Sequence, residues 1–471
     1  MSRTDDGVAH PELTRSVPAD LLRKYDRPGP RYTSYPTAVE FNVSFDECAY
    51  RRKLSEAAEA VGEPLSLYVH LPFCARRCTF CGCMVIVTRK REVAARYLGY
   101  LHREIGMLAR TLGHRRRVVQ YHWGGGTPTY LDLAQMKALQ EVVTRHFEID
   151  PRAEVAVEID PRVTTGEQIV LLRSMGFNRL SMGVQDFSPT VQAVVNRKQS
   201  ESQTRAVFAD ARAAGFASIN IDLIYGLPCQ TPETFDRTLE SVVDMRPERI
   251  AVYSYAHVPW LHPHQKRIDP RDLPSREQKF ECFGLAIEKF LSAGYVQIGM
   301  DHFAVPSDEL AIARVQRRLH RNFMGYTTKI APDMLGLGVS AIGDVRGAFA
   351  QNVKKLSTYY AALDEGCFPI ERGYVLDADD RVRRYVITQL MCNFYLDRRA
   401  FEGRFDVAFD DYFAPEVAEL AAGPVADGFL ELHPDRLEVL PPGRCFVRNI
   451  CMTFDRYLRQ KAGQQIFSRT I

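Results

Sequence analysis

The chain has 471 residues, with 61 Lys and Arg against 58 Asp and Glu, which gives a formal net charge of +3. A charge so close to neutral argues against a general nucleic-acid binder, and 46% hydrophobic residues suffice for a sizeable core. The length predicts two or three structural units, and eleven cysteines are too sparse for a disulfide scaffold.

The sequence carries no visible targeting or membrane signal. Residues 1–6 are polar and contain no apolar segment of a signal peptide, and no apolar run reaches the length of a membrane span. We therefore expect a cytoplasmic protein whose thiols stay reduced.

Three regions follow one another along the chain. Residues 1–60 predict an N-terminal arm, polar and punctuated by Pro and Gly at first, with a leading helix near residues 47–61. Residues 61–370 predict a catalytic barrel with a substrate-side extension, and residues 371–471 a mostly helical C-terminal domain. In that last region we expect helices at 382–394 and 414–426 and a short β-like turn at 429–439.

The central region alternates strand-like and helical patterns. Strands are predicted at residues 65–72, 118–123, 154–160, 179–185, 218–225 and 249–255, and a run at 295–303 is expected to extend the sheet's edge. Six β-then-α units with right-handed crossovers predict a parallel sheet curved into a partial (β/α)6 barrel, so the fold class is α/β.

A Cys-x3-Cys-x2-Cys run, Cys74, Cys78 and Cys81, directly follows the first predicted strand. Three thiolates so spaced suit a [4Fe–4S] cube whose fourth iron has no protein ligand and is open to a small molecule. The alternatives are a zinc knuckle or buried free thiols. Structural zinc usually takes two Cys/His pairs, and no second pair lies nearby, so the cluster is favoured.

The next strands also end in residues that suit a ligand. Three glycines, 124–126, follow Trp123, and glycine lets the backbone approach a ligand closely; the alternative is a tight βα turn. Polar residues also lie at or after the ends of the later strands. They are either ordinary exposed groups or side chains that bind ribose hydroxyls and the ammonium group of an amino acid. These residues are Glu158, Asp160, Gln185, Asp186, Arg197 and Asp222. His302 and His320 are either structural or substrate-side imidazoles. Residues 335–343 imitate a dinucleotide fingerprint but open no βαβ unit, so a nicotinamide site is rejected.

The cysteine spacing resembles the signature of the radical SAM superfamily, with Tyr68-Val-His-Leu-Pro-Phe-Cys74 before it and Cys81-Gly-Cys83 closing the loop. Several segments together resemble one family within it, the oxygen-independent coproporphyrinogen III oxidases of haem biosynthesis. These segments are residues 31–37, 68–83, 122–130, 179–187, 220–228 and 299–304.

That resemblance implies a three-quarter (β/α)6 barrel, a [4Fe–4S] cluster held by Cys74, Cys78 and Cys81, and two S-adenosylmethionine (SAM) molecules. The residues implied around the cluster-bound SAM are Tyr68, Gly125, Glu158 and Ile342. Those implied around the second SAM are Phe80, Gly126, Thr127, Gln185, Arg197, Asp222 and Ala256. Cys83 is implied to be catalytic, because related haem chaperones usually lack the Cys-x-Cys ending.

The implied reaction is the oxidative decarboxylation of two propionates of coproporphyrinogen III to vinyl groups, giving protoporphyrinogen IX. Arg31 and Arg321 are candidate partners of the substrate carboxylates. The resemblance also implies an unidentified electron donor and acceptor, and we expect a monomer. A haem-binding chaperone and another radical SAM enzyme acting on a tetrapyrrole remain the alternatives.

Overall fold

A computed structural model describes residues 18–461 and 467–470 of the chain. The predicted polar start of the arm and the absence of a signal-peptide segment concern residues 1–17, which lie outside the described residues. Within the described part, no helix combines the length and the apolar character needed to cross a membrane.

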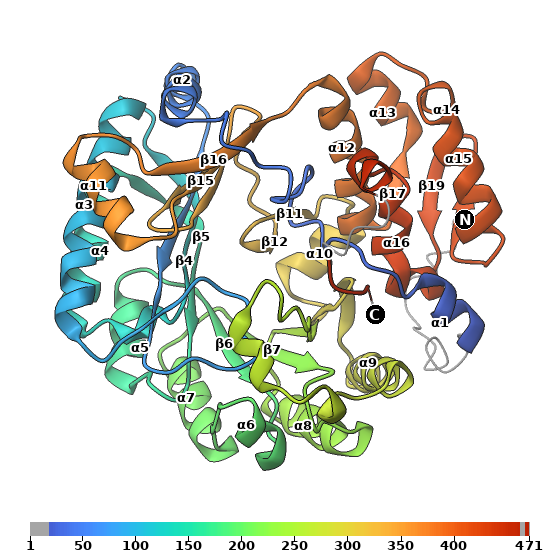
Figure 1. The fold of residues 1–471 in the computed structure, drawn as a ribbon, viewed down its shortest axis with the longest axis horizontal. Coiled ribbons are helices and arrows are strands. Elements are labelled where there is room, and N and C mark those ends of the chain that lie inside the picture. Colours follow the sequence, from blue (N-terminus) through green and yellow to red (C-terminus); the bar gives the residue numbers. More distant parts are fainter. Residues whose placement is uncertain (1–17, 462–466, 471) are drawn as a thin grey trace.

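Within the described residues a sheet of twelve strands forms the centre, and six of its neighbouring strands are parallel (Figure 1). They are β1 (Leu65–Leu71), β4 (Arg117–Gly125), β5 (Glu148–Ile159), β6 (Arg179–Gln185), β7 (Ser218–Tyr225) and β8 (Arg249–Ser254). The six predicted strands and the partial barrel are thus confirmed, and β6 and β7 begin and end where the sequence places them.

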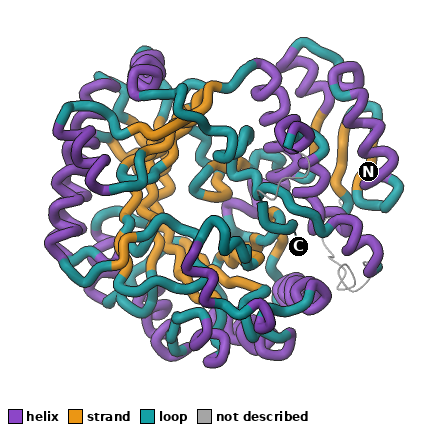
Figure 2. Tube along the Cα trace, viewed as in Figure 1, coloured by secondary structure: helices purple, strands orange, loops and turns teal. Residues whose placement is uncertain are grey.

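Helices cover the outer face of this curved sheet, and the strands form an arc inside them (Figure 2). The covering helices are α3 (Arg91–Leu112), α4 (Leu133–His146), α5 (Gly166–Ser174), α6 (Pro189–Val194), α7 (Glu201–Ala213), α8 (Pro232–Met245) and α9 (Arg276–Ser292). Successive side chains of a strand point to opposite faces of the sheet, so each strand can pack one face against the helices. In β6, Leu180, Met182 and Val184 are buried, while the residues between them are partly exposed. Several helices begin at a capping box, as at Asp132 and Thr165.

Further strands extend both edges of these six, and all of the added pairings except one are antiparallel. Beyond β8 lie β10 (His302–Ala304) and then β9 (Val296–Gly299), so the single predicted element at 295–303 is in fact a hairpin that does extend the edge. Beyond β1 lie β13 (Asp333–Leu337), which pairs with it in parallel, then β14 (Ile342–Val345), β15 (Ala348–Asn352) and β16 (Ile370–Val375). The domain boundary predicted at residue 370 coincides with the first residue of β16, which belongs to this sheet.

Shorter elements connect these parts. They are β2 (Phe73–Cys74), β3 (Ile86–Val87), α2 (Glu47–Ala58), α10 (Glu309–Val315), β11 (His320–Asn322), β12 (Gly325–Thr327) and α11 (Leu356–Asp364). The predicted leading helix at 47–61 is α2, which Asp46 caps and which ends three residues early.

The C-terminal region is mostly helical, and its apolar core also takes in Tyr25, Tyr32 and Tyr35 of the arm and Phe280 and Met300 of the barrel region. It contains α12 (Ala378–Asn393), β17 (Tyr395–Asp397), α13 (Arg398–Phe405), α14 (Phe409–Tyr412), α15 (Ala414–Leu420), β18 (Leu430–Leu432), β19 (Arg436–Val439), α16 (Val447–Met452) and α17 (Arg456–Gln460). The helix predicted at 414–426 is α15 followed by a π-helical turn, Ala421–Val425. Pro424 inside that turn has no N–H to donate, which explains the departure from α geometry.

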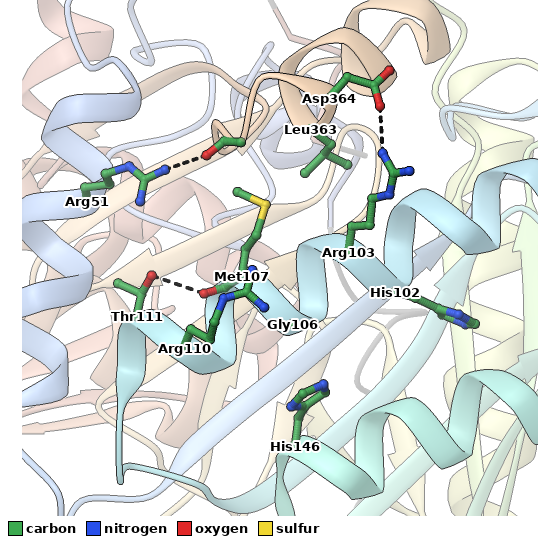
Figure 3. Close-up of a pocket in the computed structure, with 11 residues that line it drawn as sticks. Arg51, His102, Arg103, Gly106, Met107, Arg110, Thr111, His146, Leu363 and Asp364 are labelled. Carbon is green, nitrogen blue, oxygen red and sulfur yellow. Dashed lines mark hydrogen bonds and ion pairs between the residues drawn. The ribbon is translucent and has the colours of Figure 1, made fainter.

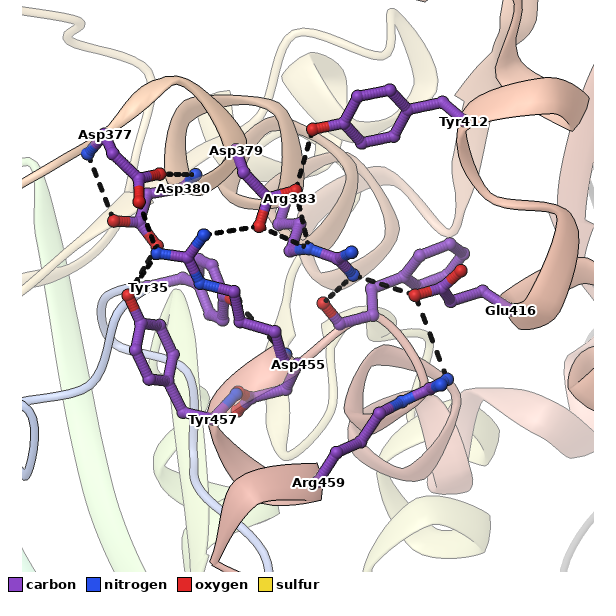
Figure 4. A network of polar contacts seen from close by, with 12 residues as sticks. Tyr35, Asp377, Asp379, Asp380, Arg383, Tyr412, Glu416, Asp455, Tyr457 and Arg459 are labelled. Carbon is purple, nitrogen blue, oxygen red and sulfur yellow. Dashed lines mark hydrogen bonds and ion pairs between the residues drawn. The ribbon is translucent and has the colours of Figure 1, made fainter.

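The N-terminal arm is joined to the C-terminal region. The first helix in the described part of the arm is α1 (Ala19–Tyr25). In the segment after this helix, the carbonyl oxygens of Gly29 and Pro30 accept hydrogen bonds from the buried guanidinium of Arg448, at 2.7 and 3.1 Å. The hydroxyl of Tyr32 donates to the carboxylate of Asp455 at 2.9 Å. A polar network of α12, α15 and α17 lies beside Tyr35 of the arm (Figure 4). In that network Arg456 pairs with Asp377 and Asp379, each at 2.6 Å. The arm and the C-terminal region are therefore held together by buried hydrogen bonds.

Candidate active site

The three cysteines of the signature lie on a loop that leaves the carboxyl end of β1. The pairing of β2 with β3 closes this loop, and Thr79 N–H donates to the Val195 carbonyl at 3.0 Å, tying the loop to the end of α6. Cys81 N–H donates to the Cys78 carbonyl, and Cys74 Sγ lies 3.4 Å from Thr127 Oγ1. The loop geometry thus places the cysteines next to the glycine turn after β4.

Two arginines lie against the sulfur of Cys78. Arg162 Nη2 and Arg197 Nη1 are each 3.6 Å from Cys78 Sγ, and both guanidinium groups also pair with Asp160, at 2.6 and 3.3 Å. Burial by itself would raise the pKa of Asp160, but the two cations outweigh it and lower that pKa. Both guanidinium groups therefore lie in contact with the Cys78 sulfur, a position that suits a negatively charged metal cluster bound there.

The other thiols of the loop differ in how readily they ionise. Burial raises the pKa of Cys74 to about 11. A hydrogen bond with Cys83 lowers the pKa of Cys81 to about 7, and the same bond raises the pKa of Cys83. Of the pair, Cys81 therefore carries the thiolate and Cys83 keeps the proton.

The donor set fits an iron–sulfur cube better than a single ion. Among the described residues, no three His, Cys, Asp or Glu side chains are grouped closely enough to hold one metal ion. A single zinc would need all its sulfurs about 2.3 Å from one point, whereas the thiolates of a cube bind different irons and stand farther apart. With three thiols on one loop and two guanidinium groups beside one of them, the residues present suit a [4Fe–4S] cluster.

The glycine turn after β4 is packed too closely for side chains. A Cβ on Gly125, whose φ is +116°, would lie 2.6 Å from the ring of His70, and one on Gly126 would lie 2.6 Å from the backbone of Pro72. The N–H groups of Gly126 and Thr127 donate to the carbonyls of Leu71 and Phe73, both at 2.9 Å. Close packing alone therefore requires glycine here, as the tight-turn alternative predicts, and the turn also lies directly beside the cysteine loop.

Glu158 near the end of β5 contacts two residues of β4, one of them in this turn. Its carboxylate accepts from Gly125 N–H at 3.1 Å and contacts His122 Nε2 at 3.2 Å. Burial would raise the pKa of Glu158, but these hydrogen bonds outweigh it and lower the pKa, so the side chain is an anion. The ring of His122 stacks on Tyr68, whose hydroxyl contacts His70 Nδ1 at 3.0 Å. Three residues predicted near one SAM molecule, Tyr68, Gly125 and Glu158, are thus brought together.

The residues predicted around a second SAM molecule fall into smaller groups. The side-chain amide of Gln265 donates to the carbonyls of Phe80 and Ala256, both at 3.2 Å, and so links these two. Arg197 donates to the Gly183 carbonyl at 2.6 Å. Gln185 ends β6 with a positive φ of 72°.

Ile342 stands apart from these groups, whereas Asp222 lines an inner cavity together with Glu158. Ile342 begins β14 and packs against the apolar cluster of Phe41, Phe349 and Leu376. Asp222 accepts hydrogen bonds from Ser181 and Asn220, each at 2.8 Å, and burial raises its pKa to about 6.

A polar cavity of about 150 Å³ lies within the barrel. Charged and imidazole side chains line much of it; they are His122, Glu154, Glu158, Arg179, Asp222, Arg249 and His302. His302 Nδ1 pairs with Asp301 at 2.8 Å and its ring meets Tyr253 and Tyr326 edge-on. This arrangement places His302 at the cavity, whereas His320 lies on β11, where burial lowers its pKa to about 4.

The structure brings Arg31 and Arg321 together. Arg321 Nη1 donates to the Arg31 carbonyl at 3.0 Å, and Arg31 Nη2 donates to the Ser254 carbonyl at the end of β8, at 2.5 Å. Burial would raise the pKa of Asp301, but His302, Arg31 and Arg321 outweigh it and bring that pKa to about 2. The two arginines therefore form a cationic cluster where the arm meets the barrel.

A larger cavity of about 760 Å³ lies on the outer face, against α3 and α11 (Figure 3). Its basic side chains are engaged in part: Arg103 pairs with Asp364 at 2.6 Å, and Arg51 donates to the Gly366 carbonyl at 2.8 Å. No residue predicted for the active site lines it, so this cavity is separate from the site.

Sequence reasoning missed four residues of the site. His122 lies in a segment that resembles the family, so that segment could have pointed to it. Arg162 follows Asp160 by two positions at a strand end, a weaker signal. His264 and Gln265 come from a distant 3-10 helix, Pro263–Arg267, and His264 Nε2 lies 2.7 Å from the Cys81 carbonyl. Nothing in their local sequence marks them.

Comparison with known proteins identifies the family to which the chain is similar. Residues 68–242 match the family model of the Radical SAM superfamily, and residues 376–446 match the HemN C-terminal domain. The chain is 48% identical to the oxygen-independent coproporphyrinogen III oxidase of Escherichia coli (strain K12), over 96% of this chain and 98% of that protein. It is 45% identical to the Synechocystis enzyme of the same name, with the same coverage.

A solved structure from the same family also matches this chain over most of its length. The coproporphyrinogen III oxidase (HemN) of Escherichia coli, described as a radical SAM enzyme, superposes with a TM-score of 0.87 at 47% identity, covering 91% of this chain and 98% of that one. The chain therefore belongs to the family of oxygen-independent coproporphyrinogen III oxidases within the radical SAM superfamily.

Proposed function

We propose that this protein converts two propionate side chains of coproporphyrinogen III to vinyl groups and so forms protoporphyrinogen IX. Each propionate loses CO2, one hydrogen atom and one electron. The observation that carries the proposal is the position of the Cys74, Cys78 and Cys81 loop against the glycine turn and Glu158, at the carboxyl ends of the barrel strands. Barrel enzymes place their chemistry at this end.

The three cysteines would hold the [4Fe–4S] cluster and the neighbouring turn would hold SAM. When bound, the cluster and SAM would together supply the one-electron chemistry that removes a hydrogen atom from a propionate. Arg162 and Arg197 contact the sulfur of Cys78, each at 3.6 Å, and would stabilise the negative charge of a cluster bound there. The carboxylate of Glu158, ionised beside His122, suits the ammonium group of a methionine moiety.

The cationic cluster of Arg31 and Arg321 would bind substrate carboxylates. Coproporphyrinogen III carries four carboxylates, and guanidinium groups bind carboxylates in a bidentate manner. Both arginines lie where the arm crosses toward the barrel. The arm and C-terminal region would also exclude water and stray reactants while a radical is present.

Two SAM molecules are proposed for each chain. Tyr68, Gly125, Glu158 and Ile342 would line the first. Phe80, Gly126, Thr127, Gln185, Arg197, Asp222 and Ala256 would line the second, and the link that Gln265 makes between Phe80 and Ala256 supports part of this set. Anaerobic equilibrium titration of the cluster-loaded protein with SAM should saturate at two molecules per chain. Saturation at one would contradict the second site.

Cys83 would act on the substrate side rather than on iron. Its thiol keeps a proton beside the Cys81 thiolate, which suits a group that donates or relays hydrogen. The further expectations are a cytoplasmic, monomeric protein and separate cellular donors and acceptors of electrons. Light scattering of the purified protein tests the monomer.

Anaerobic incubation with coproporphyrinogen III, SAM and dithionite, followed by product mass, tests the proposed function. The expected products have lost CO2 and two hydrogens at one and then two side chains. A stable complex with haem and no decarboxylation would indicate the chaperone alternative, and a ring-opened or methylated product would indicate another tetrapyrrole enzyme.

A further inference from the structure

A solvent-facing hollow of about 530 Å³ lies beside the first cysteine of the loop, and we call it the Cys74 hollow. Its lining comes from four separate segments of the chain and includes Cys74, Arg76, Asp160, Arg162, Asn196 and Lys198. Arg76, Asn196 and Lys198 are exposed, whereas Cys74 is only partly exposed. The hollow therefore leads from solvent to one proposed ligand of the cluster.

The charge of the Cys74 hollow is positive. Its one acidic side chain, Asp160, is already bound by Arg162 and Arg197. Arg76 and Lys198 are the exposed cations of its lining. Their charges are therefore available to a partner molecule, although the chain as a whole is close to neutral.

The proposed function needs an electron that comes from outside the chain. Electron transfer slows steeply with distance, so a donor must come close to the cluster without entering the substrate cavity. The Cys74 hollow meets both conditions, because Cys74 lines it and the residues of the inner cavity do not.

We propose that the Cys74 hollow and its rim are the docking surface for a small acidic one-electron carrier protein. The carrier would lose one electron and the cluster would gain it, with no bond formed or broken at this surface. Arg76 and Lys198 would attract the carrier's carboxylates and orient it, which mainly raises the association rate. This inference rests on the proposed function, because it concerns the reduction of the same cluster.

Binding is tested with an acidic plant-type ferredoxin as the probe. Oxidised ferredoxin is titrated into the anaerobic cluster-loaded protein at low and high salt, for the original chain, for Arg76→Glu and for Lys198→Glu. Arg399→Glu is the matched control, since Arg399 is exposed on α13 in the C-terminal region. We expect each reversal in the hollow to weaken binding roughly 10-fold at low salt, with the difference shrinking at high salt, and the control to bind normally.

Reduction of the cluster is measured separately from product formation. Absorbance changes on mixing with reduced ferredoxin should be slower in Arg76→Glu and Lys198→Glu, whereas dithionite should reduce all four proteins equally. Equal binding and equal ferredoxin rates in all proteins would overturn the docking surface, and so would slower reduction by dithionite. Failure of the proposed function would appear differently, as a reducible cluster that yields no decarboxylated product even with dithionite.

Discussion

Arg197 contacts Cys78 from a connection far along the chain: its Nη1 lies 3.6 Å from the cysteine sulfur. The guanidinium also pairs with Asp160 and donates to the Gly183 carbonyl, so three elements hold it in place. A fixed cation at this distance stabilises negative charge on the sulfur and on any cluster bound there.

Replacing Arg197 should lower the reduction potential of the bound cluster. A reduced cluster carries one more negative charge, so losing the nearby cation disfavours reduction. We expect Arg197→Gln to shift the potential by about −50 mV, which corresponds to roughly tenfold in a one-electron equilibrium. Arg197→Lys, which keeps the charge, should shift it less. An unchanged potential in Arg197→Gln, measured by anaerobic redox titration, would contradict this role.

The three loop cysteines should each be required for the cluster. Serine at Cys74, Cys78 or Cys81 should abolish the brown absorption and the bound iron of anaerobically purified protein. Cys48→Ser is the control, because Cys48 is exposed on α2, away from the loop. A full cluster in Cys78→Ser would show that the ligands lie elsewhere.

Cys83 should be needed for turnover but not for the cluster. The three ligands are complete without it, so Cys83→Ala should keep its iron while vinyl formation falls at least about tenfold, as loss of one proton-transfer group does. Iron content and product mass are measured on the same preparation, with Cys48→Ala as the control. Undiminished product would mean that Cys83 only packs the loop.

Alanine at Arg31 or Arg321 should weaken use of the substrate. Each lost charge-assisted hydrogen bond costs roughly 1.5–3 kcal/mol, so kcat/KM should fall by about 10-fold to 100-fold while SAM binding and iron content persist. Arg23→Ala, in the exposed last turn of α1, is the control. Normal kinetics in both variants would place the propionates elsewhere, and loss of SAM binding would assign these arginines to the cofactor.

Glu104 should make stability depend on pH. Burial raises its pKa to about 7, even though Tyr359, Asn352 and Gly338 N–H donate to its carboxylate. Between its unfolded pKa of about 4.3 and about 7 the folded chain binds the extra proton, so this residue makes stability fall as pH rises through that window. The fall should total up to roughly 4 kcal/mol and level off above a pH of about 7.

Glu104→Gln should remove this slope, although the variant is less stable at every pH because one accepting oxygen becomes an amide. The measurement is the denaturant midpoint at several pH values from 5 to 8. An equal slope in Glu104→Gln and the original chain would show that other groups set the pH dependence.

Much of the barrel could be predicted from the sequence because its signals are local. Strand patterns depend on side chains two positions apart, and the ranges predicted for β6 and β7 match the structure. The sheet edge next to β8 was harder to predict from the sequence. The run at 295–303 contains a turn at Met300 and Asp301, and the alternation of its side chains does not show where one strand ends and the next begins. The helix predicted at 414–426 ends in a π-helical turn for the local reason that Pro424 lies within it.

The sequence by itself determined the order of the elements and the spacing of Cys74, Cys78 and Cys81, because both depend on neighbours along the chain. Only the tertiary structure decided which distant groups surround those cysteines. Arg197 and His264 reach the loop from later connections, and Arg448 holds the arm from the C-terminal region. Such contacts form when the sheet curves and its strand ends converge, a long-range arrangement that no local residue pattern specifies.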